Sequence, residues 1–124
     1  MIFASIILFC LAVSLGLFLV VLGMRYKRGS LTLAMGHASL ALLGMGLLGQ
    51  QILDDSSHKL YNLAAFLFVL ALFGGLILLA LRMSHREYRT PPPMFVVILH
   101  AFVGLIALLL LLVGYSRYQV VGLS

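Results

Sequence analysis

The chain has 124 residues, of which 64% are hydrophobic and only 9% are charged. Soluble globular domains carry roughly 25% charged residues, so this composition excludes that class and predicts a single integral membrane domain over residues 1–124. The formal net charge of +5 comes from basic residues in the connections between apolar segments, so we expect no nucleic-acid partner.

Four apolar segments follow one another along the chain, at about residues 2–24, 30–53, 60–83 and 93–115. Each is long enough to cross a hydrocarbon core of about 30 Å, and each has to be helical because backbone polar groups find no water there. The first segment has no basic region before it and no cleavage site, so we expect it to be retained. Ser30 can cap the second helix, and Thr90-Pro91-Pro92-Pro93 can open the fourth. The sequence therefore predicts an all-α, integral membrane four-helix bundle.

Most of the basic residues lie in the first and third connections. These are Arg25, Lys27 and Arg28 in the first connection, and Arg82, Arg86 and Arg89 in the third. Cytoplasmic loops carry the excess of Lys and Arg, so these two connections should face the cytoplasm, with both termini outside it. The expected location is a bacterial inner membrane.

Two histidines stand inside these apolar segments, His37 in the second and His100 in the fourth. An imidazole in hydrocarbon is costly unless something binds it, so each one marks a candidate functional site. Each lies seven residues after an expected helix start, at Ser30 or Pro93, which places it about 10 Å along its helix. The two rings should therefore lie at the same depth and can face each other across the bundle.

A weak internal repeat surrounds the two histidines. Aligning His37 with His100 pairs Ala38 with Ala101, Ala41 with Gly104, Leu42 with Leu105 and Gly44 with Ala107, while Gly16-Leu17 resembles Gly75-Leu76 in the preceding helices. Such a repeat would give two helical hairpins in parallel orientation, related by a pseudo-twofold axis along the membrane normal.

Small residues follow each histidine on the same helix face, one and two turns later. They are Ala41 and Gly44 after His37, and Gly104 and Ala107 after His100. A flat porphyrin needs a strip of this kind, because larger side chains would fill its slot. The same pattern also allows bare helix–helix packing.

These features together favour one haem whose iron is bound by His37 and His100. Two axial imidazoles leave no open coordination position, which suits electron transfer rather than oxygen binding. The depth of the ligands puts the macrocycle near the cytoplasmic interface. Its propionates could then reach arginines in the basic connections, with Arg25, Arg28, Arg82 and Arg89 as the candidates.

Other roles for the two histidines stay open. They could hydrogen-bond each other, Ser39 or backbone carbonyls as a contact between helices, or they could belong to a proton relay. A Zn or Cu site usually needs three or four ligands, and Met35 is the only soft candidate nearby. His58 and His85 lie in connections and are expected to be solvated, and Cys10 is alone, so no internal disulfide can form.

With one intramembrane histidine pair on a four-helix scaffold, the chain resembles small haem-b membrane cytochromes, in the style of b561-type and respiratory-anchor cytochrome b subunits. The resemblance implies haem b held between helices and electron exchange with quinol and a partner. A b561 core usually has two histidine pairs, whereas this chain has only His37 and His100. Transfer of electrons across the whole membrane by this chain alone is therefore in doubt.

The leading functional hypothesis is a membrane electron-transfer subunit that exchanges electrons with quinone or a partner redox protein. It would be an electron carrier or a subunit rather than a stand-alone enzyme. The alternatives are a non-catalytic accessory subunit of a larger membrane complex and a small transporter, which the scarcity of membrane charges disfavours. Expected partners are the lipid bilayer and other membrane subunits or a second copy of the chain.

Overall fold

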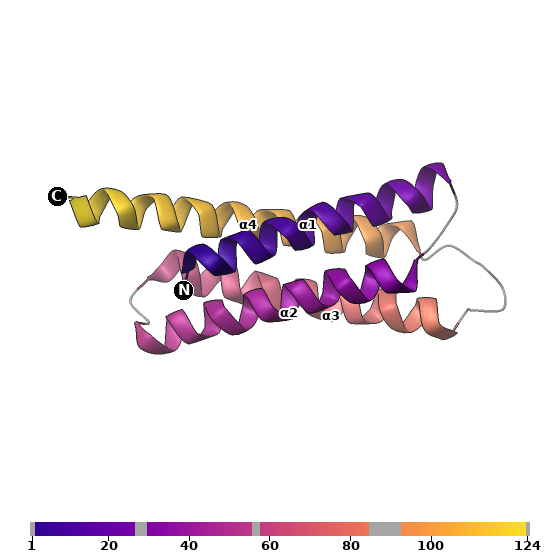
Figure 1. Cartoon of the computed structure of the whole chain (residues 1–124), viewed down its shortest axis with the longest axis horizontal. Coiled ribbons are helices and arrows are strands. Elements are labelled where there is room, and N and C mark those ends of the chain that lie inside the picture. The colour runs from indigo at the N-terminus through magenta and orange to yellow at the C-terminus, as the bar shows by residue number, and fades with distance from the viewer. Residues whose placement is uncertain (1, 27–29, 56–57, 85–92, 124) are drawn as a thin grey trace.

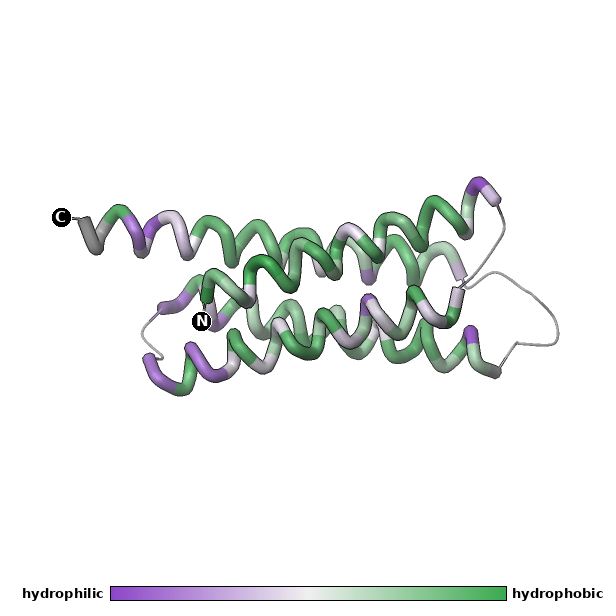
Figure 2. Tube along the Cα trace, viewed as in Figure 1, coloured by the Kyte–Doolittle hydropathy of each residue, from purple (hydrophilic) through white to green (hydrophobic). Residues whose placement is uncertain are grey.

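A computed structural model describes residues 2–26, 30–55, 58–84 and 93–123. Over these ranges the chain forms four helices, which are α1 (Ile2–Arg25), α2 (Leu31–Asp54), α3 (Lys59–Ser84) and α4 (Met94–Leu123). All four are long and apolar enough to cross a membrane, and hydrophilic residues gather toward their ends (Figure 2). The prediction of an all-α, membrane-spanning four-helix bundle is confirmed.

The helix starts follow the local signals in the sequence. Ser30 caps α2, because its Oγ accepts a hydrogen bond of 3.2 Å from the backbone N–H of Leu33. At α4, the carbonyl of Pro93 accepts from the N–H groups of Val96 and Val97. Thr90 to Pro92 lie outside the described residues.

The end of α4 departs from the sequence prediction. Helix α4 continues to Leu123 instead of ending near Tyr115. Between Gly114 and Gly122 the sequence contains no Gly or Pro that would break a helix. The last turns of α4 therefore protrude beyond the other helices (Figure 1) and carry Arg117 and Tyr118 on a helix rather than in a tail.

The bundle consists of two antiparallel hairpins. Helix α1 packs along α2 and α3 along α4, with smaller contacts of α2 with α3 and of α1 with α4. The C-terminal ends of α1 and α3 lie at the same end of the bundle as the starts of α2 and α4 (Figure 1). Arg25 and Arg82 are thus at one end, and the chain termini are at the other.

The core is centred on a pair of aromatic rings. Phe9 on α1 and Phe68 on α3 stack with centroids 3.8 Å apart and planes inclined by only 3°. Gly44 on α2 makes room for this stack, since a Cβ there would lie 3.1 Å from Cε1 of Phe9. Beside it, the fully buried Ser5 donates a hydrogen bond of 2.8 Å to the Gly44 carbonyl, which joins α1 to α2.

We expect Phe9→Ala to lower the free energy of unfolding by about 3–5 kcal/mol, because it removes half of the buried ring stack and leaves a cavity. Unfolding of the purified protein by denaturant in detergent measures this change. The matched control is Phe18→Ala on the same helix, where the side chain is 51% exposed. Equal decreases in the free energy of unfolding of the two variants would show that the ring stack does not stabilise the bundle more than an exposed ring does.

Candidate functional site

The two intramembrane histidines meet across the bundle. His37 on α2 and His100 on α4 are both partly buried, and their ring centroids lie 6.0 Å apart with the ring planes at 80°. Because α2 and α4 both start at the same end of the bundle, six residues before their histidines, the rings reach the same level. The structure thus brings together the two residues that the sequence singles out.

Each histidine is fixed by a backbone carbonyl of the other helix in its own hairpin. Nδ1 of His37 lies 2.6 Å from the Ala12 oxygen on α1, and Nδ1 of His100 lies 2.8 Å from the Ala71 oxygen on α3. A carbonyl oxygen only accepts, so Nδ1 carries the hydrogen in both rings. In a neutral imidazole this leaves Nε2 as an acceptor or a metal ligand, and no other hydrogen bond to either ring is seen within the described ranges.

A glycine one turn after each acceptor makes room for the ring. A Cβ at Gly16 would lie 3.0 Å from Cε1 of His37, and a Cβ at Gly75 would lie 3.0 Å from Cε1 of His100. In an α-helix the carbonyl of residue i points toward residue i+4, so a side chain at the glycine would crowd the approach to the carbonyl. The motif Ala-x-x-x-Gly-Leu occurs at both places, and the two hairpins repeat the same histidine contact.

The four small residues of the predicted strips lie in different surroundings. Gly44 packs against Phe9, and Ala107 is fully buried in the core cluster, so protein side chains surround both. Ala41 is partly buried. Gly104, one turn after His100, is partly buried, and no atom lies within 4 Å of a Cβ built there. A Cβ at Gly104 would therefore meet open space.

Two of the four candidate arginines, Arg25 near the end of α1 and Arg82 near the end of α3, lie at the end of the bundle where α2 and α4 start. Arg82 donates a hydrogen bond of 3.2 Å to the Ser30 carbonyl and so ties the end of α3 to the start of α2. Arg25 is exposed, with its guanidinium 6.0 Å from the centre of the Tyr26 ring. Neither contact involves a histidine, and Arg28 and Arg89 lie outside the described residues.

No group of three His, Cys, Asp or Glu residues that could hold a metal ion occurs in the part of the chain that the structure describes. Cys10 is exposed on α1, and His58 pairs with Asp55 at 3.3 Å. His85 falls outside the described residues. Beside His100, a groove of about 490 Å³ between α3 and α4 has Gly74 in its wall and otherwise apolar side chains such as Leu99 and Val103.

Comparison of the chain with models of known protein families, with curated proteins and with solved structures finds no match.

Substitution of Gly104 tests whether the open space beside this residue is where a cofactor binds. If the histidine pair binds haem, Gly104→Ala should leave the haem unchanged and Gly104→Leu should reduce it, because a branched side chain would compete with the porphyrin for the space beside His100, and such overpacking costs about 1–3 kcal/mol. Helix insertion should be unaffected, since Leu is favourable in hydrocarbon. Ala41→Leu is expected to act in the same way. Haem per folded protein is the measurement, and full occupancy in Gly104→Leu would mean that this face does not line a cofactor.

Proposed function

We propose that this chain is a membrane electron-transfer subunit that holds one haem b between His37 and His100. The observation that carries the proposal is the pair of imidazole rings 6.0 Å apart, each oriented by a hydrogen bond from Nδ1 to a backbone carbonyl. Histidines that ligate metals almost always donate their other ring N–H to such a partner, which fixes the tautomer and strengthens the ligand.

The donor set fits haem better than a bare ion. Zn and Cu ions take three or four protein ligands, whereas haem iron needs only axial ligands from the protein. Two metal–imidazole bonds of about 2 Å each, together with the radii of the two rings, require a centroid separation of roughly 6 Å. The separation between His37 and His100 meets that requirement.

The haem would supply one-electron chemistry, and the residues of the chain would hold and tune it. His37 and His100 would hold the iron through Nε2, and the Ala12 and Ala71 carbonyls would keep both rings in the tautomer that this requires. Iron held by two histidines would exchange electrons with a quinone or a partner redox protein rather than bind oxygen. The apolar groove beside His100 gives a lipid-soluble electron carrier a route close to this ligand.

The same hydrogen bonds also support a second candidate, a non-catalytic accessory subunit. Each bond from a histidine to a carbonyl joins two helices of one hairpin and would stabilise the fold without any cofactor. The two proposals differ at Nε2, which ligates iron in the first and has no assigned role in the second.

The proposed orientation places the basic end of the bundle in the cytoplasm, in a bacterial inner membrane. Arg25 and Arg82 belong to the last turns of α1 and α3, which lie at that end. We expect reporter fusions in the connection between α2 and α3, and at the C-terminus, to report the outer side. A cytoplasmic C-terminus would overturn this orientation and move the proposed haem to the other leaflet.

A visible absorption spectrum of protein purified from haem-replete cells tests the proposed function. The expected result is a b-type spectrum, with one haem per chain, whose bands sharpen when the haem is reduced chemically. A short-chain quinol should reduce the haem as well. Protein that is folded but colourless would favour the accessory-subunit role.

A further inference from the structure

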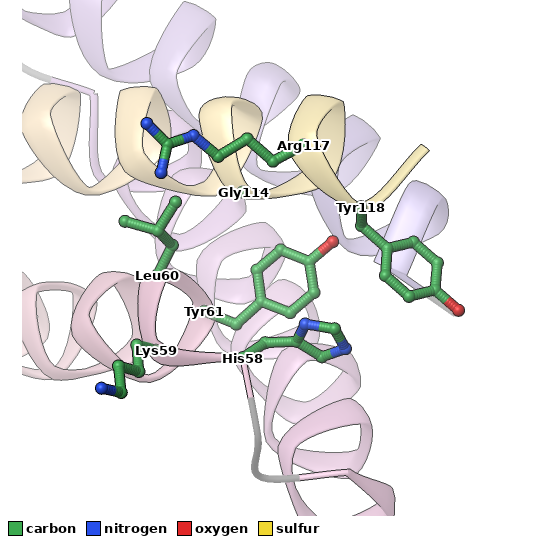
Figure 3. Close-up of a pocket in the computed structure, with 7 residues that line it drawn as sticks. All are labelled: His58, Lys59, Leu60, Tyr61, Gly114, Arg117 and Tyr118. Carbon is green, nitrogen blue, oxygen red and sulfur yellow. The ribbon is translucent and has the colours of Figure 1, made fainter. Parts of the chain in front are cut away.

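A second polar site lies at the end of the bundle that is remote from the basic connections. Between the first turn of α3 and the extended part of α4 there is a pocket of about 280 Å³, open at one side (Figure 3). Its wall includes Lys59 and Tyr61 from α3 and Gly114, Arg117 and Tyr118 from α4. None of these residues belongs to the histidine pair.

The charges around this pocket favour an anion. Lys59 and Arg117 contribute one positive charge each from two facing helices. The pocket also adjoins the N-terminus of α3, where backbone N–H groups without intrahelical partners carry the positive end of the helix dipole. His58 also lines the pocket, and its partner Asp55, at 3.3 Å, brings one acidic side chain to this end of the bundle. Arg117 reaches this place because α4 stays helical past Tyr115.

A buried hydroxyl points to a missing polar partner at the same place. Tyr61 is only 2% exposed, and its hydroxyl makes no hydrogen bond to any described residue. Gly114 lets the ring approach α4 this closely, since a Cβ there would lie 2.9 Å from Cε1 of Tyr61. Figure 3 shows the hydroxyl directed toward α4 beside Tyr118. A buried donor without an acceptor is costly, and a ligand oxygen would remove that cost once the side chains that cover the hydroxyl move slightly to admit it.

We propose that this pocket binds the phosphate of an anionic phospholipid. Arginine and lysine hold phosphate oxygens well, and a helix N-terminus is a ready-made phosphate site. The pocket lies where the apolar helices give way to polar residues (Figure 2), which is the level of lipid headgroups. Tyr118 and Tyr61 fit this level too, because tyrosines concentrate at the membrane–water interface. The lipid would hold the end of α3 against α4.

Native mass spectrometry of the purified chain with added phosphatidylglycerol or phosphatidylcholine tests this proposal. One phosphatidylglycerol per chain should be retained, about tenfold more tightly than phosphatidylcholine. Arg117→Gln removes an exposed charge without disturbing the core and should weaken phosphatidylglycerol binding about tenfold. Tyr61→Phe keeps the ring packing and should weaken it several-fold. The matched control is Arg25→Gln, an exposed arginine at the opposite end of the bundle, which should bind as the wild type does.

Several outcomes would overturn the proposal. Equal retention of both lipids would mean that the anionic headgroup is not recognised, and displacement by millimolar inorganic phosphate would identify a soluble anion instead of a lipid. The pocket would not be the binding site if Arg117→Gln bound phosphatidylglycerol like the wild type, or if Arg25→Gln weakened its binding as much as Arg117→Gln does. A Tyr61→Phe variant that becomes more stable but retains the lipid unchanged would lead to the same conclusion. Haem content should be unchanged in Arg117→Gln and Tyr61→Phe, whose residues line only this pocket, so the lipid result is independent of the histidine site.

Discussion

Replacing either His37 or His100 by alanine should remove nearly all low-spin haem from the purified protein. In the proposed site each histidine would supply one bond to the iron, and the apolar segments contain no third histidine that could take its place. The remaining imidazole would leave an iron with an open position, and such iron is high-spin or is lost during purification. The measurement is haem per chain, together with the reduced-minus-oxidised spectrum.

The control for this experiment is His58→Ala. His58 lies at the opposite end of the bundle, paired with Asp55, and its loss should leave the spectrum intact, as should His85→Ala in the third connection. A normal spectrum in His37→Ala or His100→Ala, or a damaged one in His58→Ala, would show that the ligands have been assigned to the wrong residues.

The second large effect is expected at the glycines that admit the imidazoles. Gly16→Ala or Gly75→Ala would place a methyl group 3.0 Å from Cε1 of the neighbouring histidine. Because the new methyl group is fixed to the helix backbone, the histidine ring has to move, and we expect it to move away from its carbonyl acceptor. Loss of such an outer-shell hydrogen bond typically lowers metal affinity about 10–100-fold, so we expect much weaker haem retention and a shifted reduction potential.

The matched control for these variants is Gly46→Ala, because no atom lies within 4 Å of a Cβ at Gly46. It makes the same chemical change on a membrane helix and should leave haem retention unchanged. If Gly16→Ala and Gly46→Ala retained haem equally, the hydrogen bonds to Ala12 and Ala71 would have no part in cofactor binding.

The number and type of the helices could be predicted from the sequence because the bilayer imposes them. A segment of roughly 20 apolar residues has one stable conformation in hydrocarbon, and Ser30 is a standard N-cap. The end of α4 could not be placed in this way. Hydropathy marks where the apolar stretch stops, near Tyr115, but it does not mark the end of the helix, which lies at Leu123.

The meeting of His37 and His100 could also be anticipated, since equal distances from two helix starts give equal depth. The backbone carbonyls that accept hydrogen bonds from the two rings could not be identified from hydropathy, because every residue has a carbonyl. The usable signal was Ala-x-x-x-Gly-Leu, present at Ala12 and again at Ala71. The role of Gly44 was hidden for a related reason, since a small residue in a membrane helix fits a cofactor and a neighbouring ring equally well. Only the packing shows that Phe9 lies against it.

Electron paramagnetic resonance of the oxidised, purified protein is the most direct test of whether His37 and His100 ligate one iron. The prediction is a low-spin ferric signal of the strongly anisotropic kind that nearly perpendicular imidazole planes produce, because the two rings lie at 80° to each other. A high-spin ferric signal, or the absence of any haem signal from folded protein, would contradict bis-histidine ligation.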